Sequence, residues 1–325
     1  MQPKSAPSSA PSRSASSKPV PAPAGERLRT YTLGQNLITV SRPSPGLYLV
    51  ATPIGNLGDI TLRALETLAG ADVIACEDSR VTRKLLDRFL ISTPLTPYHE
   101  HNAQAARPKL LERLAQGASI ALVSDAGTPL ISDPGFKLVR ETAAAGHAIT
   151  PLPGPSAVLA ALTVAGLPTD RFYFEGFLPP KDGARRARIK ELASIDATLV
   201  LFEGGSRVGD ALRDLADALG ERDAAVCREL TKLHEDIRRA PLKALAADTS
   251  RLETRGEFVI VVGPPHADAQ RLSASDVDDI LKAALKDQSV KDAVAHAVEL
   301  SGRPKREVYA RALELAKRDA VNEED

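Results

Sequence analysis

Acidic and imidazole side chains stand directly behind short apolar runs of this chain. Glu77 and Asp78 follow the run at 72–76, Arg80 comes two residues later, and His99 lies in the next polar stretch. Carboxylates and imidazoles can accept a proton from a substrate hydroxyl, and an arginine can hold a phosphate. The same residues also allow a structural interpretation, in which Asp78 caps the helix that follows it.

Three turns rich in glycine and proline form a second group. They lie at residues 51–56, 124–129 and 153–157, and each follows an apolar run. Glycine lets a backbone approach a ligand closely and proline fixes a backbone dihedral, so these turns present amide and carbonyl groups in fixed positions. At the carboxyl edge of a parallel sheet such turns bind ligands. Taken singly, each is also compatible with an ordinary strand-to-helix connection.

From Gly46 onward, short apolar runs alternate with amphipathic segments. The runs predict buried strands at 47–50, 72–76, 119–123 and 148–152. The spacing of the apolar residues between them predicts helices at 62–69, behind an Asp59 cap, at 81–89 and at 110–114. This alternation is typical of a largely parallel sheet covered by helices.

A second series of elements begins after a hinge at 167–170. Strands predicted at 198–202, 224–227 and 257–262, with a helix between the first two, indicate a second α/β domain. The tail has helical spacing but no strand pattern, which predicts a three-helix module. The N-terminal part is built from Ser, Pro, Ala and scattered basic residues and is predicted to be a disordered extension. The expected division is therefore 1–42, 46–166, 167–265 and 272–318.

Composition limits the class of protein. With 325 residues and 43% hydrophobic content, the chain is long enough for two or three folded domains. Its 42 basic residues balance 42 acidic ones, so the overall charge does not indicate nucleic-acid binding. Without an apolar run of about 20 residues or a secretory signal, we expect a cytoplasmic protein with no membrane contact.

The cysteines and histidines indicate neither a disulfide nor a metal site. Cys76 and Cys227 lie in separate apolar runs, which favours buried thiols. His99 and His101 form a pair without the third and fourth ligands of a zinc site, so we expect no metal. The chain also lacks the GxxxxGK[S/T] and GxGxxG patterns of two common nucleotide sites. From the residues alone, the three turns fit any small polar ligand.

Several long motifs occur in an order that resembles one bacterial enzyme family. The first domain contains YLVATPIGNL (48–57), EDSR (77–80), HEHN (99–102), SDAGTPLISDPG (124–135) and LPGP (152–155). The second contains FEGFLP (174–179), RELTK (228–232) and GEF (256–258). This series closely resembles the 16S ribosomal RNA (cytidine-2'-O)-methyltransferases of the tetrapyrrole methylase superfamily. The resemblance covers about residues 46–264, and GRPKREVY (302–309) resembles that family's helical module.

The resemblance implies a two-domain α/β tetrapyrrole-methylase fold (class III methyltransferase) with a C-terminal three-helix module. It also implies a homodimer that uses S-adenosyl-L-methionine to methylate the 2'-hydroxyl of a decoding-centre cytidine in 16S ribosomal RNA, within the small ribosomal subunit. The cofactor is expected in the cleft between the two domains. The residues expected to bind it are Pro53, Ser124, Asp125, Ala126, Gly127, Thr128, Pro129, Leu130, Ile131, Pro153, Gly154, Pro155, Ser156, Ala157, Phe202, Glu229 and Leu230.

Methyl transfer to a ribose hydroxyl needs an in-line arrangement of donor and acceptor and is helped by a proton acceptor. We expect Glu77 and Asp78 to face the acceptor, Arg80 to hold a phosphate, and His99 to be a further catalytic candidate. A basic stretch after the FEGFLP motif is expected to contact RNA phosphates, although its pattern is also typical of a solvated helix face. Its residues are Lys181, Arg185, Arg186, Arg188 and Lys190.

Two alternatives stay open at this point. A small-molecule, tetrapyrrole-type methyltransferase would share the donor site and differ only on the acceptor side; the EDSR and FEGF motifs favour RNA. A non-catalytic RNA-binding assembly protein would have no need for the intact loop at 124–135.

One departure limits the resemblance: relatives commonly carry ESPHR where this chain has EGGSR at 203–207, so no role for that histidine or proline is carried over.

Overall fold

The computed structural model describes residues 28–249, 254–265, 274–301 and 303–322. The first domain is built on a five-stranded sheet of order β5-β4-β6-β3-β7, in which every strand pair is parallel. The strands are β3 (Gly46–Val50), β4 (Val73–Cys76), β5 (Leu95–Pro97), β6 (Ser119–Val123) and β7 (Ile149–Leu152). The predicted strands of this domain are therefore present, and β5 is an additional short edge strand.

Helices cover both faces of this sheet, because its central strands are apolar on both sides. On one face α1 (Leu62–Gly70) and α2 (Ser79–Arg88) bury their apolar stripes. On the other face α3 (Ala103–Ala115) and α4 (Phe136–Ala144) do the same. The cap of α1 corrects the prediction: the Thr61 side chain accepts from the Ala64 amide at 3.1 Å, and Asp59 lies in a preceding 3₁₀ turn, Leu57–Asp59.

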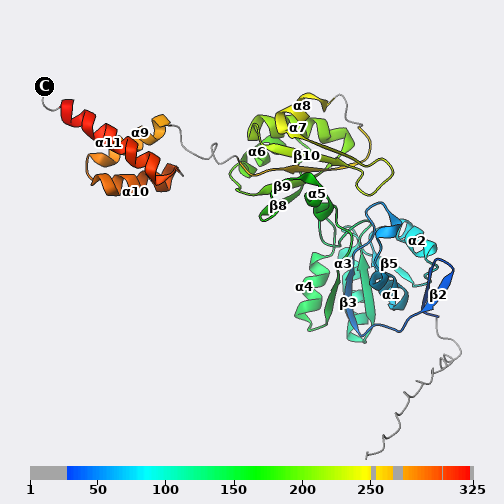
Figure 1. Cartoon of the computed structure of the whole chain (residues 1–325). Coiled ribbons are helices and arrows are strands. Elements are labelled where there is room, and N and C mark those ends of the chain that lie inside the picture. Colours follow the sequence, from blue (N-terminus) through cyan, green and yellow to red (C-terminus); the bar gives the residue numbers. More distant parts are fainter. Residues whose placement is uncertain (1–27, 250–253, 266–273, 302, 323–325) are drawn as a thin grey trace, which may run out of the picture.

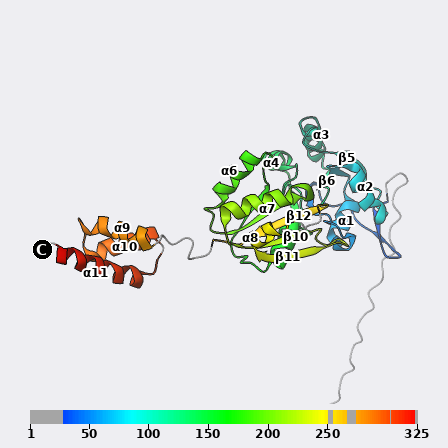
Figure 2. The same ribbon diagram turned by 90° about the horizontal axis from the view of Figure 1, so that it is seen from above.

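The second domain has a mixed sheet of order β11-β10-β12-β9-β8. Only the β8–β9 pair is parallel among its four pairings. The strands are β8 (Phe172–Phe177), β9 (Thr198–Gly204), β10 (Asp223–Arg228), β11 (Asp236–Pro241) and β12 (Glu257–Val262). Three helices, α6 (Asp182–Leu192), α7 (Gly205–Leu219) and α8 (Leu242–Ala247), bury apolar side chains against one face. Figure 2 shows α6 and α7 side by side.

Helix α5 (Ala157–Ala165) joins the two domains in an unexpected way. By sequence it ends the segment 46–166, yet Val158, Ala161 and Leu162 pack against Val200 and Val259 of the second sheet. Figure 1 accordingly shows α5 beside β10 and not beside the first sheet. The helix is apolar on nearly all sides, so its sequence does not indicate which sheet it covers. The chain therefore crosses between domains at 153–156, one helix earlier than predicted.

The predicted disordered extension is too long. Residues 30–33 and 36–39 form an antiparallel hairpin, β1 (Thr30–Leu33) and β2 (Asn36–Thr39), and Tyr31 is buried in the first-domain core. The part at 1–27 lies outside the described residues.

In the tail, α9 (Ala274–Leu285), α10 (Val290–Ser301) and α11 (Lys305–Asn322) form the expected three-helix module around a core of its own. No helix in the described part of the chain has the length and apolar character needed to span a membrane.

Asp72 connects the residues on both sides of the N-terminal hairpin to the first sheet. Its carboxylate accepts hydrogen bonds from Arg29 at 2.9 Å, from Arg42 at 2.6 Å, and from the Ser119 amide at 2.8 Å. Burial by itself opposes the charged form, but the hydrogen bonds from Arg42 and Ser119 hold the pKa of Asp72 well below its ordinary value. A carboxyl group whose folded-state pKa is lowered stabilises the protein above its unfolded pKa, and this contribution is lost as the pH falls through the folded pKa.

Asp72→Asn is therefore expected to lower the free energy of unfolding at pH 7 by about 1.5–3 kcal/mol, because charge-assisted hydrogen bonds are lost. Urea unfolding at a series of pH values measures the effect. The difference between wild type and variant should shrink as the pH falls below about 4. Equal stability of the two proteins at pH 7 would contradict this role of Asp72.

Candidate active site

The turns that follow β3, β4, β6 and β7 are connected by hydrogen bonds at the carboxyl edge of the first sheet. Thr52 and Gly127 exchange two backbone hydrogen bonds, each 2.9 Å long, across neighbouring strands. The Thr128 hydroxyl donates to the Pro155 carbonyl at 3.2 Å, and the Asp78 amide donates to Asp125 Oδ1 at 2.9 Å. The loop after β6 thus holds the other three in place.

This loop has an unusual backbone. Gly127 has φ 77°, and two residues with side chains, Leu130 at φ 75° and Ser132 at φ 61°, also lie in the left-handed region. For residues with side chains, such conformations cost about 1–3 kcal/mol each and persist where the surrounding structure enforces them, often at ligand sites. At Gly154, an added Cβ would come within 2.9 Å of the Ala51 side chain, which explains the glycine of the third turn. The turns are thus a strained, tightly packed edge.

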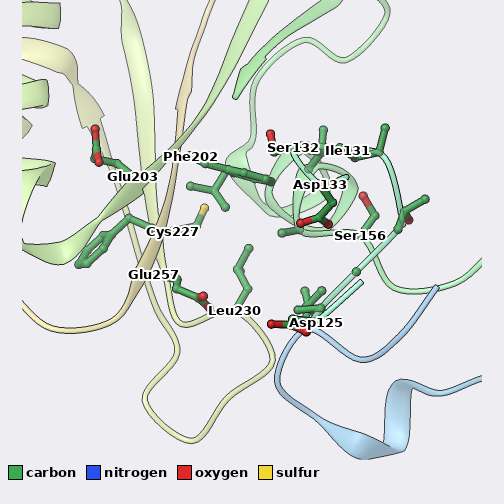
Figure 3. A pocket seen from close by; sticks show the side chains of 18 of the residues that line it. Asp125, Ile131, Ser132, Asp133, Ser156, Phe202, Glu203, Cys227, Leu230 and Glu257 are labelled. Atoms are coloured by element: carbon green, nitrogen blue, oxygen red, sulfur yellow. The ribbon is translucent and has the colours of Figure 1, made fainter. Parts of the chain in front are cut away.

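A cavity of about 460 Å³ lies between this edge and the second domain. In Figure 3, Ile131, Ser132, Asp133 and Ser156 lie on the first-domain side, opposite Phe202, Cys227 and Leu230. Ten of the residues predicted to bind the cofactor line it: Asp125, Ala126, Gly127, Thr128, Ile131, Ser156, Ala157, Phe202, Glu229 and Leu230. The structure thus brings together loops from the two domains, which are separate segments of the sequence.

The other predicted cofactor residues lie in or directly after the same three turns. They are Pro53, Ser124, Pro129, Leu130, Pro153, Gly154 and Pro155, none of which lines the cavity. The Ser124 hydroxyl, for example, donates to the Ala126 carbonyl at 3.2 Å and supports the turn. Sequence analysis also missed several lining residues, among them Ser132, Asp133, Phe177, Cys227 and Val259. Asp133 lies within the same SDAGTPLISDPG motif, so the motif itself was a signal for it.

Among the predicted catalytic residues, Glu77 lines the cavity. Burial, together with the negative charges of Asp125, Asp133 and Asp78, raises the pKa of Glu77 above its ordinary value. Burial, together with the negative charge of Asp125, also raises the pKa of Asp133 above its ordinary value. The cavity is therefore acidic on its first-domain side. The free thiol of Cys227 on the opposite side has its pKa raised to about 11 by burial, so it remains protonated near neutral pH.

Asp78 and Arg80 form a pair at the start of α2. The Asp78 side chain accepts from the Arg80 amide at 2.8 Å and caps the helix, and its second oxygen bonds the Arg80 guanidinium at 2.6 Å. Hydrogen bonds from Arg80 lower the pKa of Asp78 to about 2. Asp78 thus has the capping role that the sequence offered as an alternative. The Arg80 side chain is 87% exposed and remains accessible to a ligand.

His99 lies outside the cavity lining. Its backbone amide donates to Asn102 Oδ1 at 2.9 Å, and its ring meets that of His101 edge-on with centroids 6.1 Å apart. Within residues 28–249, 254–265, 274–301 and 303–322, no cluster of three His, Cys, Asp or Glu side chains has the arrangement of a metal site.

The basic residues at 181–190, in and just before α6, differ in how far they are buried and in their partners. Arg185 is buried and its Nε donates to Asp214 on α7 at 2.7 Å, so this guanidinium holds two helices together and cannot reach a phosphate. Arg186 also bonds Asp214, and Arg188 bonds Glu175 and Glu191. Lys181 and Lys190 are exposed. The expectation of a uniform RNA-binding face is therefore corrected for Arg185.

Comparisons with known proteins identify the family and the fold. Residues 46–246 match the family described as Tetrapyrrole (Corrin/Porphyrin) Methylases, and residues 271–316 match the RsmI C-terminal HTH domain. The fold is similar to a cobalt precorrin-4 methyltransferase (20% identity, TM-score 0.50, 67% of this chain and 94% of that one). It is also similar to a diphthine synthase (18% identity, TM-score 0.53, 67% and 89%).

Curated relatives are much closer in sequence. A protein of Mesorhizobium japonicum is 50% identical over 87% of this chain and 96% of its own length. One of Vibrio cholerae is 46% identical over 85% and 97%, and both are named ribosomal RNA small subunit methyltransferase I. The chain therefore belongs to the tetrapyrrole methylase family, a class of methyltransferases whose cofactor is S-adenosylmethionine. Within that class it is a member of the ribosomal RNA small subunit methyltransferase I family.

The Thr52–Gly127 connection can be tested with a pair of glycine variants. Gly127→Ala and Gly146→Ala both place a side chain at similar φ angles, 77° and 74°, but only Gly127 lies at the cavity. Each variant is expected to lose about 1–2 kcal/mol of stability.

Only Gly127→Ala should weaken S-adenosylmethionine binding, by roughly tenfold, since a loss of about 1.4 kcal/mol at the site has that effect. Isothermal titration calorimetry measures the affinity, and Gly146→Ala is the matched control. Equal affinities of the two variants would show that the backbone at Gly127 does not shape the cofactor site.

Proposed function

We propose that this chain transfers the methyl group of S-adenosylmethionine to the 2'-hydroxyl of a decoding-centre cytidine in 16S ribosomal RNA. The observation that carries the proposal is the cavity between the two domains, with Glu77 on its first-domain side. The names of the relatives that match nearly their full length support ribosomal RNA of the small subunit as the acceptor. The choice of the cytidine 2'-oxygen rests on the resemblance of the sequence motifs.

The lining of the cavity fits the cofactor in charge and polarity. Pockets of about 300–1,000 Å³ hold ligands of this size. Asp125, Asp133 and Glu77 place negative charge where a cationic sulfonium is favoured, and Phe202, Leu230 and Val259 offer an apolar wall to an adenine ring. When bound, the cofactor supplies an electrophilic methyl group. The protein has to orient the acceptor hydroxyl in line with it and take up the hydroxyl proton.

Glu77 is the proton acceptor that the geometry favours. Glu77 lines the cavity, and burial and neighbouring negative charges raise its pKa toward neutral pH, where a general base is most effective. Asp78 is a weaker base, because its carboxylate is held by the α2 backbone and by Arg80. We infer that Arg80, three residues after Glu77 in the sequence and with its side chain 87% exposed, holds a phosphate of the RNA.

The RNA surface that we propose is narrower than the full basic stretch. It includes the exposed Lys181, Arg186 and Lys190, and leaves out Arg185, which is buried. The tail module, whose match is described as an HTH domain, adds Lys305 and Arg306 at the start of α11.

The same proposal includes a homodimer, the small ribosomal subunit as partner and a cytoplasmic location. Light scattering of the purified protein tests whether it is a homodimer.

The decisive experiment offers labelled S-adenosylmethionine with three acceptors: small ribosomal subunits, free 16S ribosomal RNA and a porphyrin-type tetrapyrrole. We expect label on RNA, mapped by nuclease digestion and mass spectrometry to a cytidine 2'-oxygen. Label on the tetrapyrrole alone would overturn the proposal and favour the small-molecule alternative. Bound cofactor with no transfer to any acceptor would favour the non-catalytic alternative.

Glu77→Gln is expected to lower kcat by about 10²- to 10⁴-fold, the usual contribution of a general base. Asp78→Asn keeps an oxygen for the helix cap and is expected to retain activity within a few-fold, so it is the matched control. In the wild type, kcat/KM should fall on the acid side through the pKa of Glu77, at a pH above the ordinary 4.5. Glu77→Gln with wild-type kcat would remove Glu77 from the chemistry.

A further inference from the structure

The RELTK stretch at the end of β10 contains a charged cluster with no role in the proton transfer proposed above. Lys232 Nζ donates to Glu229 Oε1 at 2.9 Å and to Glu257 Oε2 at 2.7 Å. Glu229 Oε1 also accepts from the Glu257 amide at 2.9 Å. The three side chains thus connect the β10–β11 loop to the start of β12, and all three line the cavity.

The aliphatic part of the Lys232 side chain, which belongs to the second domain, lies close to Gly55 of the first domain. A Cβ added at Gly55, in the turn after β3, would lie 2.3 Å from Lys232 Cγ, 3.0 Å from Cε and 3.1 Å from Cδ. Real Cβ atoms do not approach another carbon this closely, so only glycine at 55 leaves room for the lysine as it lies. Gly55 belongs to the same turn as Thr52, which bonds Gly127.

The loop that carries Lys232 is held in a strained form. Glu229 has φ 49° and Thr231 φ 67°, both left-handed and neither a glycine. Glu229 is further enclosed by Gly256, at which a Cβ would come within 2.8 Å of its carboxylate. Between the two strained residues lies Leu230, which is 7% exposed and lines the cavity. Such strain persists only where several contacts impose it, and the Lys232 cluster provides them.

We propose that Lys232 is a positioning residue: its ammonium fixes Glu229 and its stem rests on Gly55, so it sets the spacing of the two walls of the donor cavity. Through this contact it keeps Leu230 against the cofactor and controls the affinity for S-adenosylmethionine. The inference rests on the cofactor site of the proposed function and is independent of which acceptor is methylated. Lys232 takes no part in bond making or breaking.

A double-mutant cycle on the full-length protein tests this contact. Gly55→Ala is expected to weaken S-adenosylmethionine binding roughly tenfold by displacing the lysine, and Lys232→Ala to weaken it similarly. In the Lys232→Ala background, Gly55→Ala should have almost no further effect, because the atom it would strike, Cγ, is gone. Lys232→Arg keeps a similar stem and a cation and should restore affinity to within a few-fold. Calorimetry with S-adenosylmethionine gives all the affinities.

Two further measurements separate positioning from general destabilisation. Lys243→Met, which removes the exposed Lys243–Glu221 pair of the same domain, should leave the affinity unchanged. With any acceptor that the wild type methylates, Lys232→Ala should raise KM for S-adenosylmethionine while kcat at saturation stays within a few-fold.

The proposal is overturned if Gly55→Ala binds like wild type, or if its effect is as large without the lysine as with it. A wild type that binds S-adenosylmethionine but methylates no RNA would instead refute the proposed function. The binding cycle would in that case still decide the role of Lys232.

Discussion

The candidate site depends on one pair of backbone hydrogen bonds, those between Thr52 and Gly127. They join the turns after β3 and β6, two neighbouring parallel strands whose carboxyl ends lie at the same edge. Because Gly127 adopts φ 77°, the loop after β6 turns back toward β3 and presents Asp125 to the Asp78 amide and Thr128 to Pro155. The loop after β6 therefore fixes the turns after β3, β4 and β7 through these hydrogen bonds.

The second constraint is the path of the chain. At 153–156 the backbone leaves the first sheet, and α5 packs on the second. The turn that ends the first wall is therefore also the connection to the second wall, where Phe202 and Leu230 lie. The two walls are therefore joined by a short stretch of chain and also by the close approach of the Lys232 side chain to Gly55. The first wall carries the carboxylates Glu77, Asp125 and Asp133, whereas the second combines an apolar surface of Phe202, Leu230 and Val259 with the charged cluster around Lys232.

Much of this was predictable from the sequence. The strands at 46–50 and 119–123 are continuous apolar runs between turn residues, so their burial and parallel pairing follow from pattern alone. The resemblance of the motifs supplied the fold, the cofactor and both groups of cavity loops. The fold, the enzyme class and the cofactor are confirmed by the family matches. The remaining site assignments are still predictions.

The rest needed tertiary structure. Strand β11 is rich in charged residues because it is a sheet edge, and β8 is interrupted by a bulge at Phe174/Gly176, so neither has a clean alternating pattern. Arg185 is spaced like a solvated helix residue, and only the position of Asp214 on α7 shows that it is buried. The direction in which α5 packs is likewise hidden, since a helix that is apolar all round has no preferred face.

The most direct test of the central claim is a crystal structure of the protein with S-adenosylmethionine. We predict that the ligand lies between the loop at 125–133 and the wall formed by Phe202 and Leu230, with the Thr52–Gly127 hydrogen bonds intact and the sulfonium methyl group directed toward the Glu77 side of the cavity. A ligand bound elsewhere, or bound only after these hydrogen bonds break, would contradict the account.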